Sequence, residues 1–377
     1  MQETIVHLAR RRNLNRQKTL EKFIKCVENG KIFIGHQYST IMSVKNGMKE
    51  SDIHDLTGEE AAIVGLDFLS LIGAEGTTPE NAWKDNMDAT EKAVKAGAFM
   101  TVSSHFPNFA YSKKIRKNSD GKYDFGLCSY ADSKILKPCA SEILTSTESQ
   151  EKFNAALDIV ADYAAVLKEK NLSFLFRPFH EDNGGWFWWG TITTAEDFKK
   201  VWIYIYKYFK SKGIDNILYS YSPNGPFESP EEYMRRYPGD EYVDFMGFDY
   251  YDDCNSLRDY SIEPFEEKLK MSCRSVRIAA ETHGKIPVIS EVGVRVKVLG
   301  ADSIVASGNP VTGSDWYERI VQTAVSEKMA YVLFWGNYGA DNFFVPYKGH
   351  EMEKEFMNMV SDGKAVFSKE AAFDKWS

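Results

Sequence analysis

Two glutamates end short apolar runs, where a carboxylate can be held rigidly beside a substrate. Glu181 ends the run Phe174–Glu181, FLFRPFHE, and the segment DNGGWFWWG follows it with three tryptophans. Glu291 follows PVIS in the run Pro287–Gly293. Hydrolysis of a glycosidic bond needs one carboxylic acid to protonate the leaving oxygen and a second carboxylate to attack the anomeric carbon or to activate water. A single glutamate of this kind is more often a helix cap or an ion-pair partner, but two of them among aromatic residues indicate a catalytic pair.

Polar residues near the two glutamates suit the protonation states that this chemistry requires. The acid must keep its proton at the working pH, and burial by tryptophan together with a nearby carboxylate would raise the pKa of Glu181. The nucleophile must be ionised, and Arg177 and Tyr251 are candidates to keep Glu291 in that state. The sequence therefore predicts a polar support beneath the catalytic pair.

Tryptophans near the pair are candidate platforms for sugar rings. A single tryptophan belongs to the core more often than to a binding face, but Trp186 lies in the cluster WFWW with glycines on both sides. This setting favours a binding role for Trp186, whereas Trp188 and Trp189 suit core and platform equally well. Trp335, in the last apolar run, is a second candidate platform. His36 and Gln37, which end the first run, could reach a more distant sugar or simply pack at a strand end.

The elements that must position these residues form an alternating pattern. Eight short runs are rich in apolar, β-branched or aromatic residues, as buried parallel strands are, and helical patterns lie between them. This alternation predicts an α/β fold, a (β/α)₈ TIM barrel in which catalytic groups project from the C-terminal ends of the strands. A doubly wound sheet would alternate in the same way. The predicted strands are Ile32–Gln37, Ile63–Leu69, Ala98–His105, Phe174–Glu181, Ile217–Pro223, Val243–Tyr251, Pro287–Gly293 and Tyr331–Asn337.

Capping signals predict where several helices begin and end. The predicted helices run from Thr78 to Gly97, from Thr147 to about Lys170, from Thr193 onward, from Pro264 to about Thr282, and from Asp315 onward. The stretch from Phe106 to Ser146 is too long for a plain connection, so it should be an elaborated βα loop that helps to shape a site. With no repeat or linker in view, we expect residues 1–377 to form one catalytic barrel domain.

Composition excludes several classes of partner. The formal net charge of -8 argues against a nucleic acid, whose phosphates need a basic surface, and against an anionic membrane. No apolar run approaches the roughly 20 residues of a membrane-spanning helix. The N-terminus lacks the apolar core of a signal peptide. We therefore expect a protein that is secreted or on the cell surface and whose signal is absent from this sequence, or else a cytoplasmic one.

The sequence offers no metal-binding pattern. None of the five cysteines forms a CxxC pair, and no HExxH or HxH motif is present. A metal-dependent hydrolase is thus disfavoured, and we expect neither metal nor cofactor. Cys128 and Cys139 could pair in an oxidising compartment, although five unpaired thiols are the simpler expectation.

The segment Arg177–Gly190, RPFHEDNGGWFWWG, resembles the signature of glycoside hydrolase family 26. The resemblance continues, in the family's order along the chain, through GLDF, SSHFPN, GFDYY, SEVG and FWGNYGADNFFVPYKGHE. It implies a (β/α)₈ barrel and a retaining endo-β-1,4-mannanase that acts on mannan, glucomannan or galactomannan. By position it implies Glu181 as acid/base and Glu291 as nucleophile.

The resemblance also implies roles for residues around the pair. Those expected to contact or support the substrate are His105, Arg177, His180, Trp186, Tyr251 and Trp335, and from their strand-end positions Gln37 and Asp249. Two positions depart from the common pattern: Ser104 stands where many members have Trp, and Asp182 where Met is common. Both lie near the sugar site, so other substrates of the same family, β-1,3-xylan or mixed-linkage β-glucan, stay open. A carbohydrate-binding protein without activity is a further alternative.

Overall fold

Eight strand positions form a closed parallel ring in the computed structural model, which describes residues 14–45, 47–48, 50–74, 77–254, 260–296 and 311–374. The ring closes because β14 pairs with β13 on one side and with β1 on the other. The sixth and seventh positions are each split into two short strands. In ring order the strands are β1 Ile32–Gln37, β4 Ile63–Asp67, β5 Phe99–Ser104, β8 Phe174–Pro178, β9 Ile217–Tyr221, β10 Phe245–Met246 with β11 Asp249–Cys254, β12 Ile286–Pro287 with β13 Ile289–Val296, and β14 Tyr331–Phe334.

This ring confirms the predicted TIM barrel and excludes a doubly wound sheet, which would have two open edges. The predicted bounds of β1 are confirmed. Five other predicted strands are too long, and the remaining two are each interrupted by a break. The strand predicted to continue to Leu69 ends at Asp67, because the Asp67 side chain accepts the Leu69 N–H and caps a short helix, α4 Phe68–Leu71. The strand predicted to continue to Glu181 is also too long. It ends at Pro178, because the next residue, Phe179, has a φ of 54°.

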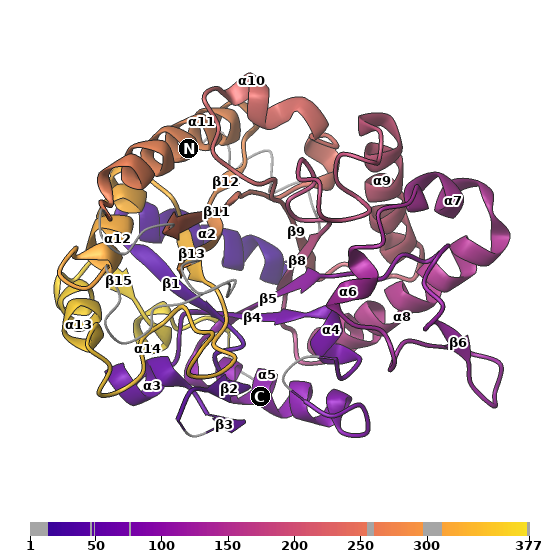
Figure 1. Ribbon diagram of the computed structural model, residues 1–377, viewed down its shortest axis with the longest axis horizontal. Coiled ribbons are helices and arrows are strands. Elements are labelled where there is room, and N and C mark those ends of the chain that lie inside the picture. Colours follow the sequence, from indigo (N-terminus) through magenta and orange to yellow (C-terminus); the bar gives the residue numbers. More distant parts are fainter. Residues whose placement is uncertain are drawn as a thin grey trace.

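Helices surround the ring as an outer layer (Figure 1). All five predicted helices exist. The starts at Pro264 and Asp315 are confirmed, whereas the other three helices have other N-terminal capping residues than predicted. Thr78 and Pro79 do not start their helix, since it begins after Asn81, although Gly97 ends it in the left-handed conformation as predicted. The capping residues of the next two are Ser146 and Thr194, each one position from the predicted threonine. The helices are α5 Ala82–Ala96, α8 Thr147–Glu169, α9 Ala195–Ser211, α11 Glu263–His283 and α12 Trp316–Ser326.

The long segment between β5 and α8 folds into small elements of its own, as the loop length predicts. It contains a hairpin of β6 Arg116–Lys117 and β7 Tyr123–Asp124, followed by α6 Tyr130–Ser133 and α7 Cys139–Thr145. The thiols of Cys128 and Cys139 are free, as are the other three, and all five are buried. The possible disulfide between Cys128 and Cys139 is therefore not formed.

Helix α2, Leu14–Glu28, was not predicted, and it closes the N-terminal end of the barrel (Figure 1). Its residue Phe23 is fully buried and packs edge-on against three phenylalanines of the strands. The ring centroids lie 5.0–5.6 Å apart for Phe33, Phe99 and Phe245. Because α2 closes this end, an open site can lie only at the other end of the barrel, where the strands have their C-termini.

The remaining described elements connect or cover the barrel. No described helix is long and apolar enough to cross a membrane. The first 13 residues, on which the expectation about a signal rests, lie outside the described part of the chain. The elements are β2 Met42–Ser43, β3 Gly47–Met48, α3 Asp52–Thr57, α10 Pro230–Tyr233, η1 Met234–Arg236, η2 Asp240–Tyr242, α13 Glu353–Ser361, β15 Ala365–Val366 and α14 Ser368–Ala371.

Candidate active site

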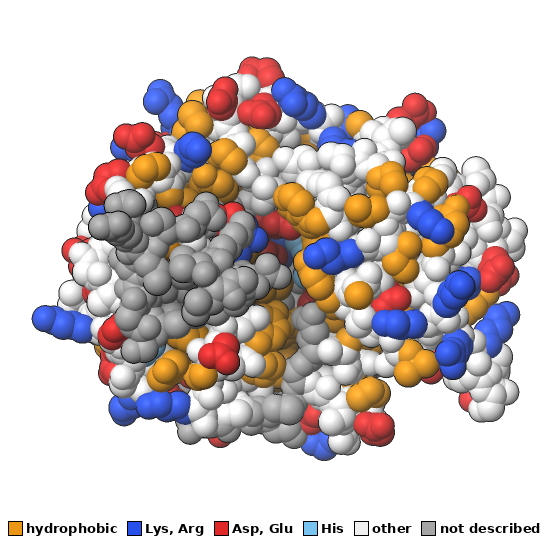
Figure 2. All heavy atoms as spheres, viewed as in Figure 1, with side chains coloured by type: hydrophobic (Ala, Val, Ile, Leu, Met, Phe, Trp, Pro, Cys, Tyr) orange, Lys and Arg blue, Asp and Glu red, His pale blue; other side chains and the backbone are white. Residues whose placement is uncertain are grey.

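A cavity of about 740 Å³ opens at the C-terminal ends of the strands. Figure 2 shows a hollow near the centre of this face, with acidic, basic and histidine side chains visible between hydrophobic ones. Both predicted catalytic glutamates line it, together with aromatic residues from several loops. The described lining residues are His105, Tyr130, Lys134, His180, Glu181, Trp186, Phe187, Asn224, Tyr251, Asp253, Glu291, Arg295, Trp335, Tyr338, Asn342 and Phe344.

Glu181 lies just beyond β8 in an unusual backbone conformation. Its φ is 54°, in the left-handed region, and its N–H donates to the carbonyl of Ser222 at 2.7 Å. Burial, and after it the charge of Glu291, raise the pKa of Glu181 to about 7, whereas the Trp186 indole opposes this rise. Near neutral pH this carboxyl group can therefore both give up and take back a proton.

Glu291, on β13, is held by hydrogen bonds to each of its carboxylate oxygens. A guanidinium nitrogen of Arg177 contacts Oε1, and the Tyr251 hydroxyl donates to Oε2 at 2.8 Å. Burial, and then the charge of Glu291, raise the pKa of Tyr251 well above its ordinary value, so the hydroxyl keeps its proton and remains a donor. Both predicted partners of Glu291 thus contact it directly.

Asp249 completes a group of three carboxylates. One oxygen of Glu181, one of Asp249 and one of Glu291 all lie within 4.8 Å of one another. Such a cluster could hold a cation, but Arg177 already lies between two of its members, 2.8 Å from Asp249 Oδ2. Since that guanidinium neutralises much of the charge and Glu181 binds a proton near pH 7, the donor set suits proton transfer better than a metal ion.

Trp186 contacts the side chain of Glu181 as well as lining the cavity. Its indole N–H donates to Glu181 Oε2 at 2.6 Å. The ring packs directly on Gly184, where an added Cβ would lie 2.4 Å from a ring carbon, which explains a glycine at this position. Trp188 and Trp189, which the sequence left open, are core residues, because both are fully buried.

The two predicted histidines meet at the wall of the cavity. Their Nε2 atoms are 3.1 Å apart, and His105 Nδ1 is 2.9 Å from the carboxylate of Asp67. The half-buried ring of Trp335 lies beside them, with its centroid 6.2 Å from that of His105. Both histidines and this tryptophan thus lie where the sequence predicted them, around the catalytic pair.

Three predicted residues do not line the cavity. Arg177 and Asp249 lie beneath the glutamates, and both oxygens of Asp249 are engaged, by Arg177 and by the Ser222 hydroxyl. They can support the pair but do not face a substrate. Gln37 is buried at the end of β1 and packs against Gly65, where an added Cβ would lie 1.8 Å from its side-chain oxygen. Gln37 is therefore placed for strand-end packing.

Sequence reasoning missed several lining residues. Tyr130 and Lys134 come from the long loop after β5, whose shape no short motif predicts. Asp253 and Arg295 form a two-contact ion pair at 2.6 and 2.9 Å, and the guanidinium lies 4.6 Å from the centre of the Tyr251 ring. Valines at every second position of β13 extend that strand to Val296, and this alternation could have indicated that Arg295 belongs to the strand end.

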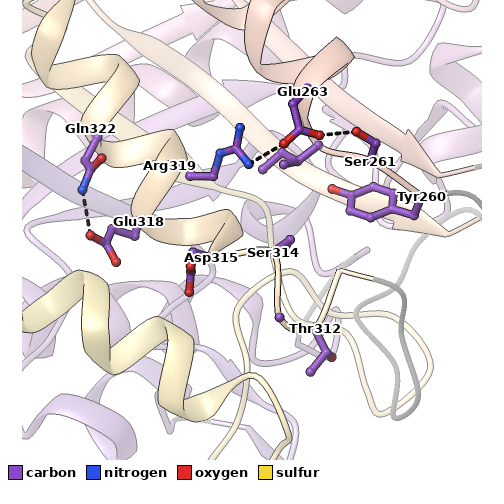
Figure 3. A pocket seen from close by; sticks show the side chains of 11 residues that line it. Tyr260, Ser261, Glu263, Thr312, Ser314, Asp315, Glu318, Arg319 and Gln322 are labelled. Carbon is purple, nitrogen blue, oxygen red and sulfur yellow. Dashed lines mark hydrogen bonds and ion pairs between the residues drawn. The ribbon is translucent and has the colours of Figure 1, made fainter.

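A second cavity, of about 530 Å³, lies beside the first turns of α11 and α12 (Figure 3). Two of its glutamates are engaged on the surface. Glu263 accepts from Ser261 and from Arg319, and Glu318 accepts from Gln322. The contacts with Ser261 and Arg319 lower the pKa of Glu263, so it is unsuited to act as a general acid, and this cavity does not resemble a hydrolytic site.

Comparisons with known proteins agree with the geometry of the first cavity. Residues 12–304 match glycosyl hydrolase family 26. A mannan endo-1,4-β-mannosidase from Bifidobacterium adolescentis is 29% identical over 95% of this chain, and one from Bacillus subtilis is 29% identical over 59% of it. The chain spans 35% of the length of the first relative and 58% of the second.

A solved structure shares the whole fold. The catalytic domain of an endo-β-1,4-mannanase from Bacillus sp., in the same family, superposes with a TM-score of 0.77 at 27% identity and covers 95% of each chain. The barrel is thus shared with a known sugar-cleaving protein.

Proposed function

The chain belongs to glycosyl hydrolase family 26, and on this premise we propose that it is a retaining endo-β-1,4-mannanase with Glu181 as acid/base and Glu291 as nucleophile. One observation carries the proposal. The carboxylates of Glu181 and Glu291 approach within 4.8 Å, one with a pKa of about 7 and the other held by Arg177 and Tyr251. Retaining glycosidases hold their two carboxyl groups about 5–5.5 Å apart, whereas inverting ones leave about 6.5–9.5 Å for a water molecule.

The proposed reaction proceeds in two displacements. Protonated Glu181 donates its proton to the glycosidic oxygen while a carboxylate oxygen of Glu291 bonds to the anomeric carbon, and the bond to the leaving sugar breaks. Glu181 is then an anion, which the Trp186 N–H stabilises. In the second step Glu181 takes a proton from water, and the water oxygen replaces Glu291 at the anomeric carbon. Two inversions give net retention.

The choice of mannan as substrate rests on the named relatives. The two curated relatives named above are mannan endo-1,4-β-mannosidases, and the solved structure is that of an endo-β-1,4-mannanase. The two departures from the family pattern, Ser104 and Asp182, are both buried. Neither of them is among the residues that line the cavity. We further propose that residues 1–377 act as one catalytic domain, because the described residues build a single barrel around a single hollow end.

Hydrolysis assays test the proposal. The protein should release reducing sugars from mannan, glucomannan or galactomannan faster than from β-1,3-xylan or mixed-linkage β-glucan. Proton NMR during cleavage of a manno-oligosaccharide should show the β-anomer before mutarotation. A preference for xylan or mixed-linkage glucan would assign another substrate of the family, and first-formed α-anomer would refute retention. Binding of mannan without turnover would indicate a carbohydrate-binding protein.

A further inference from the structure

Asp67 is a buried carboxylate that the proposed reaction does not use. It ends β4, is completely buried and has both of its oxygens engaged. Oδ1 accepts the Leu69 N–H at 2.9 Å. Oδ2 accepts the Ser103 hydroxyl at 2.6 Å and lies 2.9 Å from His105 Nδ1. A residue at this position needs only the Leu69 contact to cap α4, so the contact with His105 calls for another explanation.

The contact with Asp67 determines which nitrogen of His105 carries a proton. Burial would raise the pKa of Asp67, but the positive charge of protonated His105, followed by hydrogen bonds from His105, Ser103 and the Leu69 N–H, outweighs burial and holds the pKa below its ordinary value. An ionised carboxylate only accepts hydrogen bonds, so His105 must donate from Nδ1. Above the pH at which His105 loses its second proton, the ring is neutral and its Nε2 atom is an acceptor.

The position of the proton on His105 also determines which nitrogen of His180 is protonated. His180 Nε2 lies 3.1 Å from His105 Nε2, and two acceptors cannot bond to each other, so His180 must donate from Nε2. Burial lowers the pKa of His180 well below its ordinary value, which keeps this ring neutral. The hydrogen bonds thus run in one direction, from His180 to His105 to Asp67. Glu181 directly follows His180 in the chain and has the left-handed backbone described above.

We infer that Asp67 is a positioning residue of this active site: it fixes the tautomers of His105 and His180 and thereby the conformation in which the chain presents Glu181. The inference rests on the proposed function for its effect on turnover, but its hydrogen bonds do not depend on the substrate. Aromatic rings pack edge-on around His105 and restrict its rotation, with centroids at 5.1 Å for Tyr130 and 5.3 Å for Phe187. The imidazole is therefore confined to the plane in which Asp67 and His180 are its partners.

Asp67→Asn tests this role with almost no change in shape. The amide oxygen should take the place of Oδ1, since the backbone N–H groups of Leu69 and His105 both point there, at 2.9 and 3.2 Å. The amide NH₂ then faces His105 Nδ1 and donates to it. His105 must move its proton to Nε2, where it meets the N–H of His180. Ser103 keeps a partner, because its hydroxyl also lies 3.3 Å from the Leu66 carbonyl.

Two measurements follow from this argument. Nitrogen-15 NMR of histidine-labelled protein, recorded above the pH at which His105 becomes neutral, should show the wild-type proton of His105 at Nδ1 and that of His180 at Nε2. Asp67→Asn should change the tautomer of at least one ring. On mannan, kcat should fall by about tenfold or more while KM changes little, because a misplaced acid affects the transition state more than binding.

A matched control is Asp244→Asn, at the plugged end of the barrel. Asp244 is also fully buried, and on substitution it also loses its charge beside a basic side chain, since it lies 2.8 Å from Arg16. This variant should lose stability but keep the kcat of the wild type. Wild-type kcat with unchanged tautomers in Asp67→Asn would overturn the inference.

The NMR spectrum of the wild type decides the case even if Asp67→Asn does not fold or mannan is not the substrate. His105 protonated at Nε2 in that spectrum would contradict the chain of hydrogen bonds. Conversely, the predicted tautomers in a protein that does not cleave mannan would refute the proposed function and leave the role of Asp67 in ordering the two rings supported.

Discussion

Replacing Trp186 with phenylalanine separates two roles of this residue. The variant keeps an aromatic face toward the cavity but loses the N–H that donates to Glu181 Oε2 at 2.6 Å. That hydrogen bond favours the ionised form of Glu181, so its loss should raise the pKa of Glu181 further above the present value of about 7. Because the first step needs protonated Glu181, activity falls as pH rises through this pKa. The high-pH limb of the profile should therefore move to higher pH.

The size of the shift can be estimated from the contact. A hydrogen bond to a charged group contributes about 1.5–3 kcal/mol when buried, and one pKa unit corresponds to about 1.4 kcal/mol. Glu181 is partly exposed, so water replaces part of the lost interaction. We expect the pKa to rise by about half a unit to one unit.

The assay is kcat/KM on mannan across a pH series, which reports the ionisation of the free enzyme. The matched control is Trp188→Phe, in the same loop. Trp188 also loses an N–H bond, but its acceptor is the Phe106 carbonyl at 2.9 Å and not Glu181. Its high-pH limb should stay where it is in the wild type. An unmoved limb in Trp186→Phe, or a move to lower pH, would refute the reasoning.

Three other substitutions test neighbouring parts of the site. Trp186→Ala removes the aromatic face as well, and should reduce kcat/KM on mannan by about 1–3 kcal/mol, with a smaller loss on an aryl mannobioside; equal losses together with a large fall in melting temperature would make the residue purely structural. Gly184→Ala places a Cβ 2.4 Å from the Trp186 ring and should reduce activity by displacing it, whereas wild-type kinetics would show that the ring adapts. Arg177→Met leaves Asp249 and Glu291 buried without a counter-charge and should reduce the free energy of unfolding by about 3–5 kcal/mol. Urea denaturation measures that loss, and one below about 1 kcal/mol would mean that the two carboxylates share a proton instead.

The barrel was predictable because its strands have a strong local signal. Ile32–Gln37 begins with three apolar residues directly after Lys31, and it is a strand over the predicted range. The ends of strands were harder to predict where a side chain forms a hydrogen bond with a backbone N–H group. Asp67 stops β4 by capping a helix, and a run of apolar residues that continues through Phe68 and Leu69 conceals that. The N-terminal helix that plugs the barrel was missed because its partners, such as Phe245, are far away in the sequence.

The catalytic pair was also predictable, but its surroundings were only partly so. Glu181 lies just beyond β8 and Glu291 lies on β13, both in runs of recognisable pattern, and the barrel brings these positions together. The hydrogen bond from Trp186 to Glu181 depends on a tight loop whose path the sequence does not reveal. Likewise, an aspartate at the end of a buried strand is a common cap, so nothing distinguished Asp67 until His105 was seen beside it.

The most direct test of the central claim compares Glu181→Ala with Glu291→Ala on a dinitrophenyl β-mannobioside in the presence of azide. This leaving group needs no proton, so Glu181→Ala should still form the covalent intermediate on Glu291, and azide should release it as the β-mannobiosyl azide. Glu291→Ala cannot form that intermediate and should yield either no product or the α-azide. The assignment is contradicted if Glu181→Ala stays as inactive on this substrate with azide as it is on mannan, or if its product is the α-azide.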